Sequence, residues 1–100
     1  MKTNVSILHH DYPAKMRPYV EEKLAHLERF YSKVVTMTAR LERVADHDRV
    51  EIVANCGNGA VLVADVAEDG IGKALDEAVD RMGRQMRKLH DKIVARHHGK

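Results

Sequence analysis

The amino-acid sequence predicts an α+β fold in which two helices pack on one face of a four-stranded sheet, in the order β-α-β-β-β-α. Two segments, one in each half of the chain, repeat apolar residues at helical spacing. Four shorter segments alternate apolar and polar residues, and three of them follow one another in the middle of the chain. Because each predicted strand has a single apolar face, the economical arrangement places both helices on that face.

The first part of the chain predicts one strand and one helix. The segment KTNVSIL alternates and indicates a strand over residues 2–8. The sequence HHDYP ends this strand, and a helix is expected over residues 14–32. Pro18 has no backbone donor, so it belongs in the first turn, and the regular helix begins no earlier than about Lys15. The expected inward face holds Met16, Val20, Leu24, Leu27 and Tyr31.

A meander of three antiparallel strands is expected next, over residues 34–43, 49–56 and 60–67. The segment ADHD (45–48) forms the first turn. The segment GNG (57–59) forms the second, because Gly and Asn tolerate positive φ. In the first strand of the meander, the residues expected to share the inward face are Val35, Met37, Ala39 and Leu41.

A long helix is expected over residues 70–96. Gly83 lies inside it, which costs about 1 kcal/mol relative to alanine. His90 flanks the apolar stripe and is interpreted as a packing residue. Met82 and Met86 are interpreted as core residues rather than as part of a Met-rich binding groove. The stripe consists of Ile71, Leu75, Ala78, Val79, Met82, Met86, Leu89 and Ile93.

The composition fits one globular domain spanning residues 1–100, with 44% hydrophobic and 32% charged residues. No apolar run is long enough to cross a membrane, and the N-terminus lacks the apolar core of a signal peptide. A cytoplasmic location is therefore expected. Cys56 is the single cysteine, which excludes an internal disulfide and agrees with a reducing compartment. Its place on the apolar side of a strand predicts a buried structural cysteine.

No residue pattern indicates catalysis, a cofactor or a metal site. Asp46, His47 and Asp48 are interpreted as turn formers, and no Ser or Cys has an evident general base nearby. No Gly-rich segment has the spacing of a phosphate-binding loop, and no HExxH or Cys/His spacing indicates zinc. The sequence therefore predicts a protein that is not an enzyme and has no catalytic or metal-binding residues. No cofactor, small-molecule substrate or membrane partner is expected.

Positive charge is concentrated near the end of the chain. Residues 80–100 hold seven Lys or Arg and two Asp, a net charge of +5 in a chain whose total is +2. In the last helix one arc holds Arg81, Arg84, Lys88 and Lys92, while the acidic residues other than Glu77 lie on the other flank. A similar arc of the first helix holds Lys15, Lys23, His26, Arg29 and Lys33.

This charge segregation has two interpretations. It creates an electrostatic field suited to phosphate groups, whereas a charged face can also serve only to keep a helix solvated. Nucleic acid is the simplest anionic partner for a basic surface of this size. No DNA-reading motif is present, and three Tyr and one Phe without Trp disfavour the stacking of consecutive bases. Structured RNA, which is recognised largely by shape and phosphate, fits best.

Two segments at the right separation, RPYVEEKLAHLERFY (17–31) and ALDEAVDRMGRQMRKLHDKI (74–93), resemble those of the ribosome hibernation promoting factors. This family is also called ribosome-associated translation inhibitors or sigma-54 modulation proteins. The resemblance covers nearly the whole chain, and the order of strands and helices derived above matches that of the family. The chain departs from the family pattern at Gly83, where relatives usually have Glu, and at Gly72, where they tend to have an aromatic residue.

The resemblance implies binding to the small ribosomal subunit, in the channel that holds messenger RNA and transfer RNA. It implies contacts with 16S-type ribosomal RNA, on the subunit or on whole ribosomes, and inhibition of translation in stationary phase or stress. In the family these contacts come largely from basic residues of the two helices. The matching positions in this sequence are Lys23, Arg29, Arg81, Arg84, Arg87, Lys88 and Lys92. Charge alone adds Lys15, Lys33 and Arg96 as auxiliary RNA contacts.

The chain resembles the short type of this family, so a single ribosome-binding domain without a C-terminal dimerisation domain is expected. The resemblance then implies reliance on a separate ribosome modulation factor if ribosome dimers form. The older family name leaves a second hypothesis open. In that hypothesis the protein is an interaction module that modulates a transcription (sigma) factor through the sheet face that no helix covers.

Overall fold

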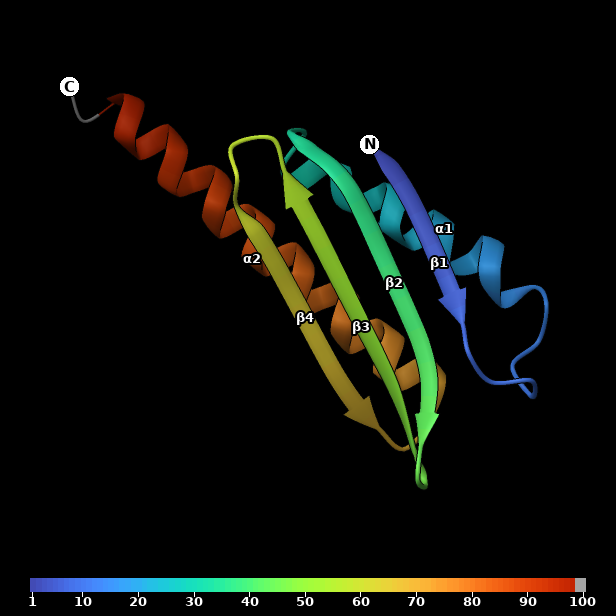
Figure 1. Ribbon diagram of the computed structural model, residues 1–100. Coiled ribbons are helices and arrows are strands. Elements are labelled where there is room, and N and C mark those ends of the chain that lie inside the picture. The colour runs from blue at the N-terminus through green and yellow to red at the C-terminus, as the bar shows by residue number, and fades with distance from the viewer. Residues whose placement is uncertain (99–100) are drawn as a thin grey trace.

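The computed structural model describes residues 1–98 and the side chains of residues 1–96. It contains four strands and two long helices in the predicted order (Figure 1), with a single 3₁₀ turn, η1, following the first helix. The elements are β1 (Lys2–Ile7), α1 (Met16–Leu27), η1 (Glu28–Phe30), β2 (Val34–Val44), β3 (His47–Cys56), β4 (Val61–Glu68) and α2 (Ile71–His98). The predicted α+β fold is confirmed.

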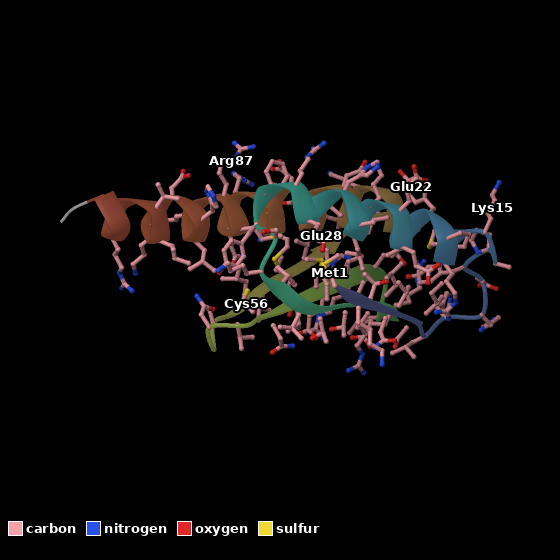
Figure 2. The ribbon with its side chains drawn as sticks, turned by 90° about the horizontal axis from the view of Figure 1, so that it is seen from above. Met1, Lys15, Glu22, Glu28, Cys56 and Arg87 are labelled. Atoms are coloured by element: carbon pink, nitrogen blue, oxygen red, sulfur yellow. The ribbon has the colours of Figure 1, made fainter. Side chains whose placement is uncertain are left out.

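The four strands form one mixed sheet in the order β1-β2-β3-β4. β1 runs parallel to β2, and a parallel pair needs a long connection, which α1 and η1 supply. β2, β3 and β4 pair antiparallel, as expected for a meander. Both helices lie on the same face of the sheet (Figure 1), and Figure 2 shows the helices as one layer and the sheet as the other.

The core lies between these two layers. Each strand turns alternate residues toward the helices, and Val50 and Ile52 of β3 are fully buried there. Leu24 of α1 and Met82 and Met86 of α2 are fully buried from the other side, which confirms the methionines as core residues. Burial of a large apolar side chain contributes roughly 1.5–3 kcal/mol, so this shared core fixes how the helices sit on the sheet.

The first helix is shorter than predicted. A helix was expected over residues 14–32, but α1 ends at Leu27 and continues only as the 3₁₀ turn η1. Tyr31 is extended, with φ −162° and ψ 110°, and its side chain is buried in the core. The carbonyl of Lys33 then accepts a hydrogen bond from the N–H of Gly57 (3.0 Å), which fixes the entry into β2 against the β3–β4 turn.

The inward face of β2 differs from the prediction at its first residues. Val35 is 55% exposed, whereas Val34 is only 4% exposed. The pairing between β2 and β3 is irregular between Val34 and Thr36, so one extra residue is inserted into β2 there. Because side chains alternate along a strand, this insertion moves Val34 to the inward face and Val35 to the outward face.

The turn between β2 and β3 is tighter than predicted, because Val44 pairs with His47 and only two residues remain outside the strands. Ala45 has a φ of 56°, a left-handed conformation that a two-residue hairpin requires. Asp48 is therefore not a turn former. It is 5% exposed, accepts a hydrogen bond from the Tyr12 hydroxyl and lies 3.6 Å from Nη1 of Arg43. Burial and Asp48 raise the pKa of Tyr12.

α2 is longer than the part of the sheet that it crosses, and Figure 1 shows its C-terminal part extending beyond the strands. Leu75 and Met82 in its first half are fully buried, whereas Leu89 and Ile93 in its second half are only partly buried. The second half therefore offers more of its surface to solvent. Within residues 1–98, neither helix is both long enough and apolar enough to cross a membrane.

Candidate nucleic-acid interface

A groove of about 440 Å³ lies between α1–η1 and α2, on the helix layer. The floor of the groove is apolar: Leu27 and Gly83 are buried, and Phe30 and Val79 are half-buried. Figure 2 shows Arg87, one of the lining residues, pointing away from the sheet. The basic residues that line the groove, called here the groove cations, are Lys23, Arg29, Arg84 and Arg87. The fold thus brings together four of the seven residues that the resemblance indicated.

Phe30 organises two of the groove cations. The guanidinium carbon of Arg29 lies 4.7 Å from the centre of the Phe30 ring, and that of Arg87 lies 4.8 Å from it. A cation over an aromatic face is attracted by the negative charge of the ring face. One aromatic side chain from η1 therefore contacts both an arginine of its own segment and an arginine of α2.

Gly83 allows Phe30 to approach α2 this closely. A Cβ atom at this position would lie 3.2 Å from Cε2 of Phe30 and 3.4 Å from Cδ2 of Leu27. These distances are at or below the lower limit of ordinary van der Waals contact. The glycine that weakens the helix by its intrinsic propensity thus gives the Phe30 ring room to pack closely on α2.

Two of the basic residues in α2 form ion pairs one turn apart. Nη2 of Arg81 lies 2.8 Å from Oε1 of Glu77, and Nη2 of Arg84 lies 2.9 Å from Oδ2 of Asp80. The expected segregation of charge is therefore incomplete, because Arg84 stands between the basic and acidic flanks. Exposed pairs of this kind contribute little to stability, so both arginines can exchange a carboxylate for a phosphate.

A second, shallower hollow adjoins the groove along α2. It is lined by Arg81, Arg84, Gln85 and Lys88. Nε2 of Gln85 donates a hydrogen bond to the carbonyl of Val63 (2.7 Å), which places this flank of α2 over the edge strand β4. Arg84 lines both hollows, so it connects the groove cations to Arg81 and Lys88.

The remaining sequence-predicted residues lie elsewhere. Lys92 and Arg96 are exposed on the second half of α2, farther along the helix than the groove. Lys33 follows η1 and lines a separate hollow next to the second half of α2, together with His90. Lys15 precedes α1, and Figure 2 shows it at one end of the helix layer, whereas Arg87 lies nearer the middle of that layer. The expectation that Lys15 and Lys33 belong to the first helix is wrong, because α1 spans only residues 16–27.

Sequence reasoning missed two residues of the groove and misplaced one other residue. Phe30 was not singled out, because nothing local to it reveals that Gly83 lies opposite. His26 also lines the groove, and its place in the basic arc of the first helix was the available signal. His90 is not a packing residue of the core: its side chain is 52% exposed, although its ring meets the edge of Tyr31 at 6.5 Å between centroids.

The outward face of the sheet has a different electrostatic character, because its charges neutralise one another. Arg49 donates to both carboxylate oxygens of Asp65 (2.9 and 2.6 Å) and to Oε1 of Glu42 (3.0 Å). This interaction lowers the pKa of Asp65. Arg40 lies 3.6 Å from Glu42 on the same face. The unneutralised positive charge is therefore concentrated on the helix layer.

Among the side chains of residues 1–96, no group of three His, Cys, Asp or Glu could hold a metal ion. Cys56 is 7% exposed, and burial raises the pKa of its thiol, which confirms it as a buried cysteine. The lining residues of the groove suit an anionic polymer rather than a metal, because four of them are Lys or Arg and two are Asp.

Comparison with known families identifies the family of this chain. The family model described as "Sigma 54 modulation protein / S30EA ribosomal protein" matches residues 3–94. This chain belongs to that family. The matched residues include nearly all of the four-stranded sheet and every residue that lines the groove.

Individual S30EA relatives agree with this assignment. The chain is 27% identical over 99 residues to the ribosome hibernation promoting factor of Azotobacter vinelandii, covering 99% of this chain and 92% of that protein. It is 28% identical over 92 residues to the protein of the same name from Pseudomonas putida, covering 92% and 89%. A ribosome hibernation promotion factor from Deinococcus radiodurans is 37% identical over 84 residues, which cover 79% of this chain and 44% of that protein.

Solved structures show the same S30EA architecture. The N-terminal domain of Thermus thermophilus Protein Y superposes with a TM-score of 0.75 at 26% identity, covering 89% of this chain and 99% of that domain. A ribosomal subunit interface protein from Coxiella burnetii superposes with a TM-score of 0.79, covering 91% and 99%, and its 15% identity supports the fold alone.

Proposed function

We propose that this protein is a ribosome hibernation factor that binds the small ribosomal subunit through its helix layer. It contacts 16S-type ribosomal RNA, occupies the channel for messenger RNA and transfer RNA, and so inhibits translation in stationary phase or stress. The observation that carries this proposal is the convergence on one groove of four basic residues from α1, η1 and α2, namely Lys23, Arg29, Arg84 and Arg87. The proposal requires no catalytic residue and no cofactor.

Support also comes from the names of the relatives. The proteins of Azotobacter vinelandii and Pseudomonas putida are named ribosome hibernation promoting factors, and the Coxiella burnetii structure is of a ribosomal subunit interface protein. A ribosome-bound role for the present chain places it in the cytoplasm. Where ribosomes pair, a separate ribosome modulation factor is the expected additional partner.

The physical mechanism is occlusion driven by charge. Lysine and arginine side chains release counterions from the RNA backbone when they contact phosphates, and this release supplies much of the binding free energy. Contacts of this kind position a protein without reading sequence. The basic surface extends along α2 through Arg81 and Lys88, and the exposed Lys92 lies farther along the same helix. The groove cations join this surface to α1 and η1.

The alternative function, modulation of a transcription (sigma) factor through the outward sheet face, has less support. The charged residues on that face pair with one another through Arg49, so little net charge remains to attract a partner. The helix layer, in contrast, has basic residues that meet no acidic partner in the described part of the chain, including Lys88 and Lys92.

Cosedimentation with ribosomes at low and high salt tests the proposal. The wild-type protein is expected to bind at low salt and to dissociate as salt rises. Reversing two charges with Arg84→Glu and Lys88→Glu is expected to abolish cosedimentation at moderate salt. If these side chains contact two phosphates, their loss also reduces the slope of log affinity against log salt by about 1.5.

A matched control separates a specific surface from net charge. Lys2→Glu with Arg40→Glu makes the same change in total charge on the outward face of the sheet, where both residues are exposed. This control is expected to cosediment like the wild type. Equal loss in both double variants would refute the helix-layer mechanism. Retention of the sheet control's binding with loss of the α2 variant's binding would support it.

A further inference from the structure

We infer that the groove between α1–η1 and α2 accommodates one unstacked base of single-stranded RNA, with the adjoining phosphates on the groove cations. This inference rests on the proposed function and adds to it the part of the RNA that the groove binds. It concerns a single base at one place, and not a platform for consecutive bases.

The shape and burial of the groove favour a base over a phosphate. Its volume of about 440 Å³ falls within the range of small-molecule sites, roughly 300–1,000 Å³. The floor of the groove is formed by Leu27, Phe30, Val79 and Gly83, which are apolar and at least half-buried. An apolar surface of this kind gains nothing from a strongly hydrated phosphate, whereas the face of a base is apolar and loses little on leaving water.

The two arginines held over Phe30 provide planar surfaces beside the apolar floor of the groove. The guanidinium carbons of Arg29 and Arg87 lie 4.7 and 4.8 Å from the ring centre. Unstacked RNA bases are recognised by stacking on aromatic rings or on guanidinium planes. Phe30 thus fixes two flat, positively charged groups where a base entering the groove can stack on them and its phosphates can pair with them.

The acidic residues of the groove also favour a base over a phosphate. Asp76 and Asp80 are exposed and line the groove together with the cations. Asp80 pairs with Arg84, and Asp76 adds a carboxylate that repels a phosphate entering the groove, so the phosphates belong at the basic rim. A neutral base is not repelled, and its amino group can donate hydrogen bonds to a carboxylate. The positions of the acidic and basic side chains therefore give the base and its phosphates different binding sites.

Two oligoribonucleotides of equal length test the inference on the complete protein. One is an ordinary single strand that carries all four bases, and the other is an abasic strand with the same phosphates. The wild type is expected to bind the ordinary strand about tenfold more tightly, because stacking of one base contributes on that scale. Both affinities should fall with salt in the same way, since both strands carry the same charge.

Val79→Trp fills the groove without changing any charge. It is expected to abolish the preference for the ordinary strand while leaving the affinity for the abasic strand unchanged. Val94→Trp is the matched control, because Val94 is exposed on the same helix and does not line the groove. This control is expected to keep the preference. Thermal unfolding of both variants establishes that they are folded.

Equal affinity of the wild type for the two strands would overturn the base-binding inference, and so would a preference that survives in a folded Val79→Trp variant. The comparison of strands on the wild type decides the matter even if Val79→Trp does not fold. Failure of the wild type to cosediment with ribosomes at low salt is a different result. It would overturn the proposed function, and the base-binding inference with it.

Discussion

Gly83→Ala is expected to destabilise the protein, although alanine is the better helix former. In the interior of a helix, alanine is favoured over glycine by about 1 kcal/mol. The added Cβ, however, would lie 3.2 Å from Cε2 of Phe30 and 3.4 Å from Cδ2 of Leu27. The Phe30 ring would have to shift by a few tenths of an ångström from the position in which it contacts Arg29 and Arg87, and overpacking of this kind typically costs about 1–3 kcal/mol.

The two effects together predict a net loss of about 1 kcal/mol, taking overpacking near the middle of its range. For a domain of this size, such a loss lowers the melting temperature by about 4–8 °C. Displacement of the Phe30 ring also moves the guanidinium groups of Arg29 and Arg87 that lie over it. RNA binding is therefore expected to weaken together with stability.

Thermal and urea unfolding of a double-mutant cycle provide the assay. Phe30→Leu removes the ring atoms nearest to Gly83, so in that background Gly83→Ala is expected to stabilise the protein instead. The sign change corresponds to a coupling of at least about 1 kcal/mol between the two positions. Gly72→Ala is the matched control on the same helix: nothing lies within 4 Å of the added Cβ, and a gain of up to about 1 kcal/mol is expected.

The reasoning would be refuted if Gly83→Ala stabilised the wild type as Gly72→Ala does, with no coupling to Phe30. The glycine would then have no role in bringing η1 onto α2. If Gly83→Ala and Phe30→Leu are coupled with the expected sign but the arginines keep their positions, the stability argument holds. The expected weakening of RNA binding would then not follow from it.

Three further predictions concern the rest of the fold. Tyr12→Phe removes the hydroxyl that donates to buried Asp48, and is expected to lower the free energy of unfolding by about 1–3 kcal/mol in urea titrations. Asp65→Asn should destabilise the protein at neutral pH and lose its effect in acid. The folded-state pKa of Asp65 is depressed by Arg49, so its contribution is present above the unfolded pKa and is lost as pH falls through the folded pKa; equal destabilisation at both pH values would contradict this. Cys56 should react with a thiol reagent much more slowly in the folded than in the unfolded protein, because its thiol is buried and its pKa raised.

The sequence was sufficient for the order and type of the elements because each has a local signature. The stripe of α2 repeats at helical spacing over many residues, and the meander strands alternate with turn residues between them. The predictions failed where a non-local contact overrode the local pattern. An inserted residue in β2 exchanged the faces of Val34 and Val35. Asp48 lies in β3 rather than in the turn, where it is buried and accepts a hydrogen bond from the Tyr12 hydroxyl.

The candidate site shows the same division. Helical spacing and the family resemblance identified Lys23, Arg29, Arg84 and Arg87 individually. On a helical wheel, however, Arg87 lies outside the basic arc of its own helix. The structure places Arg87 and Arg29 in the same groove, where both contact the ring of Phe30. A wheel describes one helix at a time, so it cannot reveal which flank of α2 faces α1.

By itself, the sequence determined the α+β order, the apolar stripe of each helix and the presence of basic residues on both helices. These properties follow from side-chain periodicity, which is local to each element. Only the tertiary structure decided which basic residues meet, that Gly83 admits Phe30 against α2, and that Lys15 and Lys33 lie away from the groove. The rotation and separation of the helices arise from close packing against a shared sheet, and close packing depends on residues far apart in the chain.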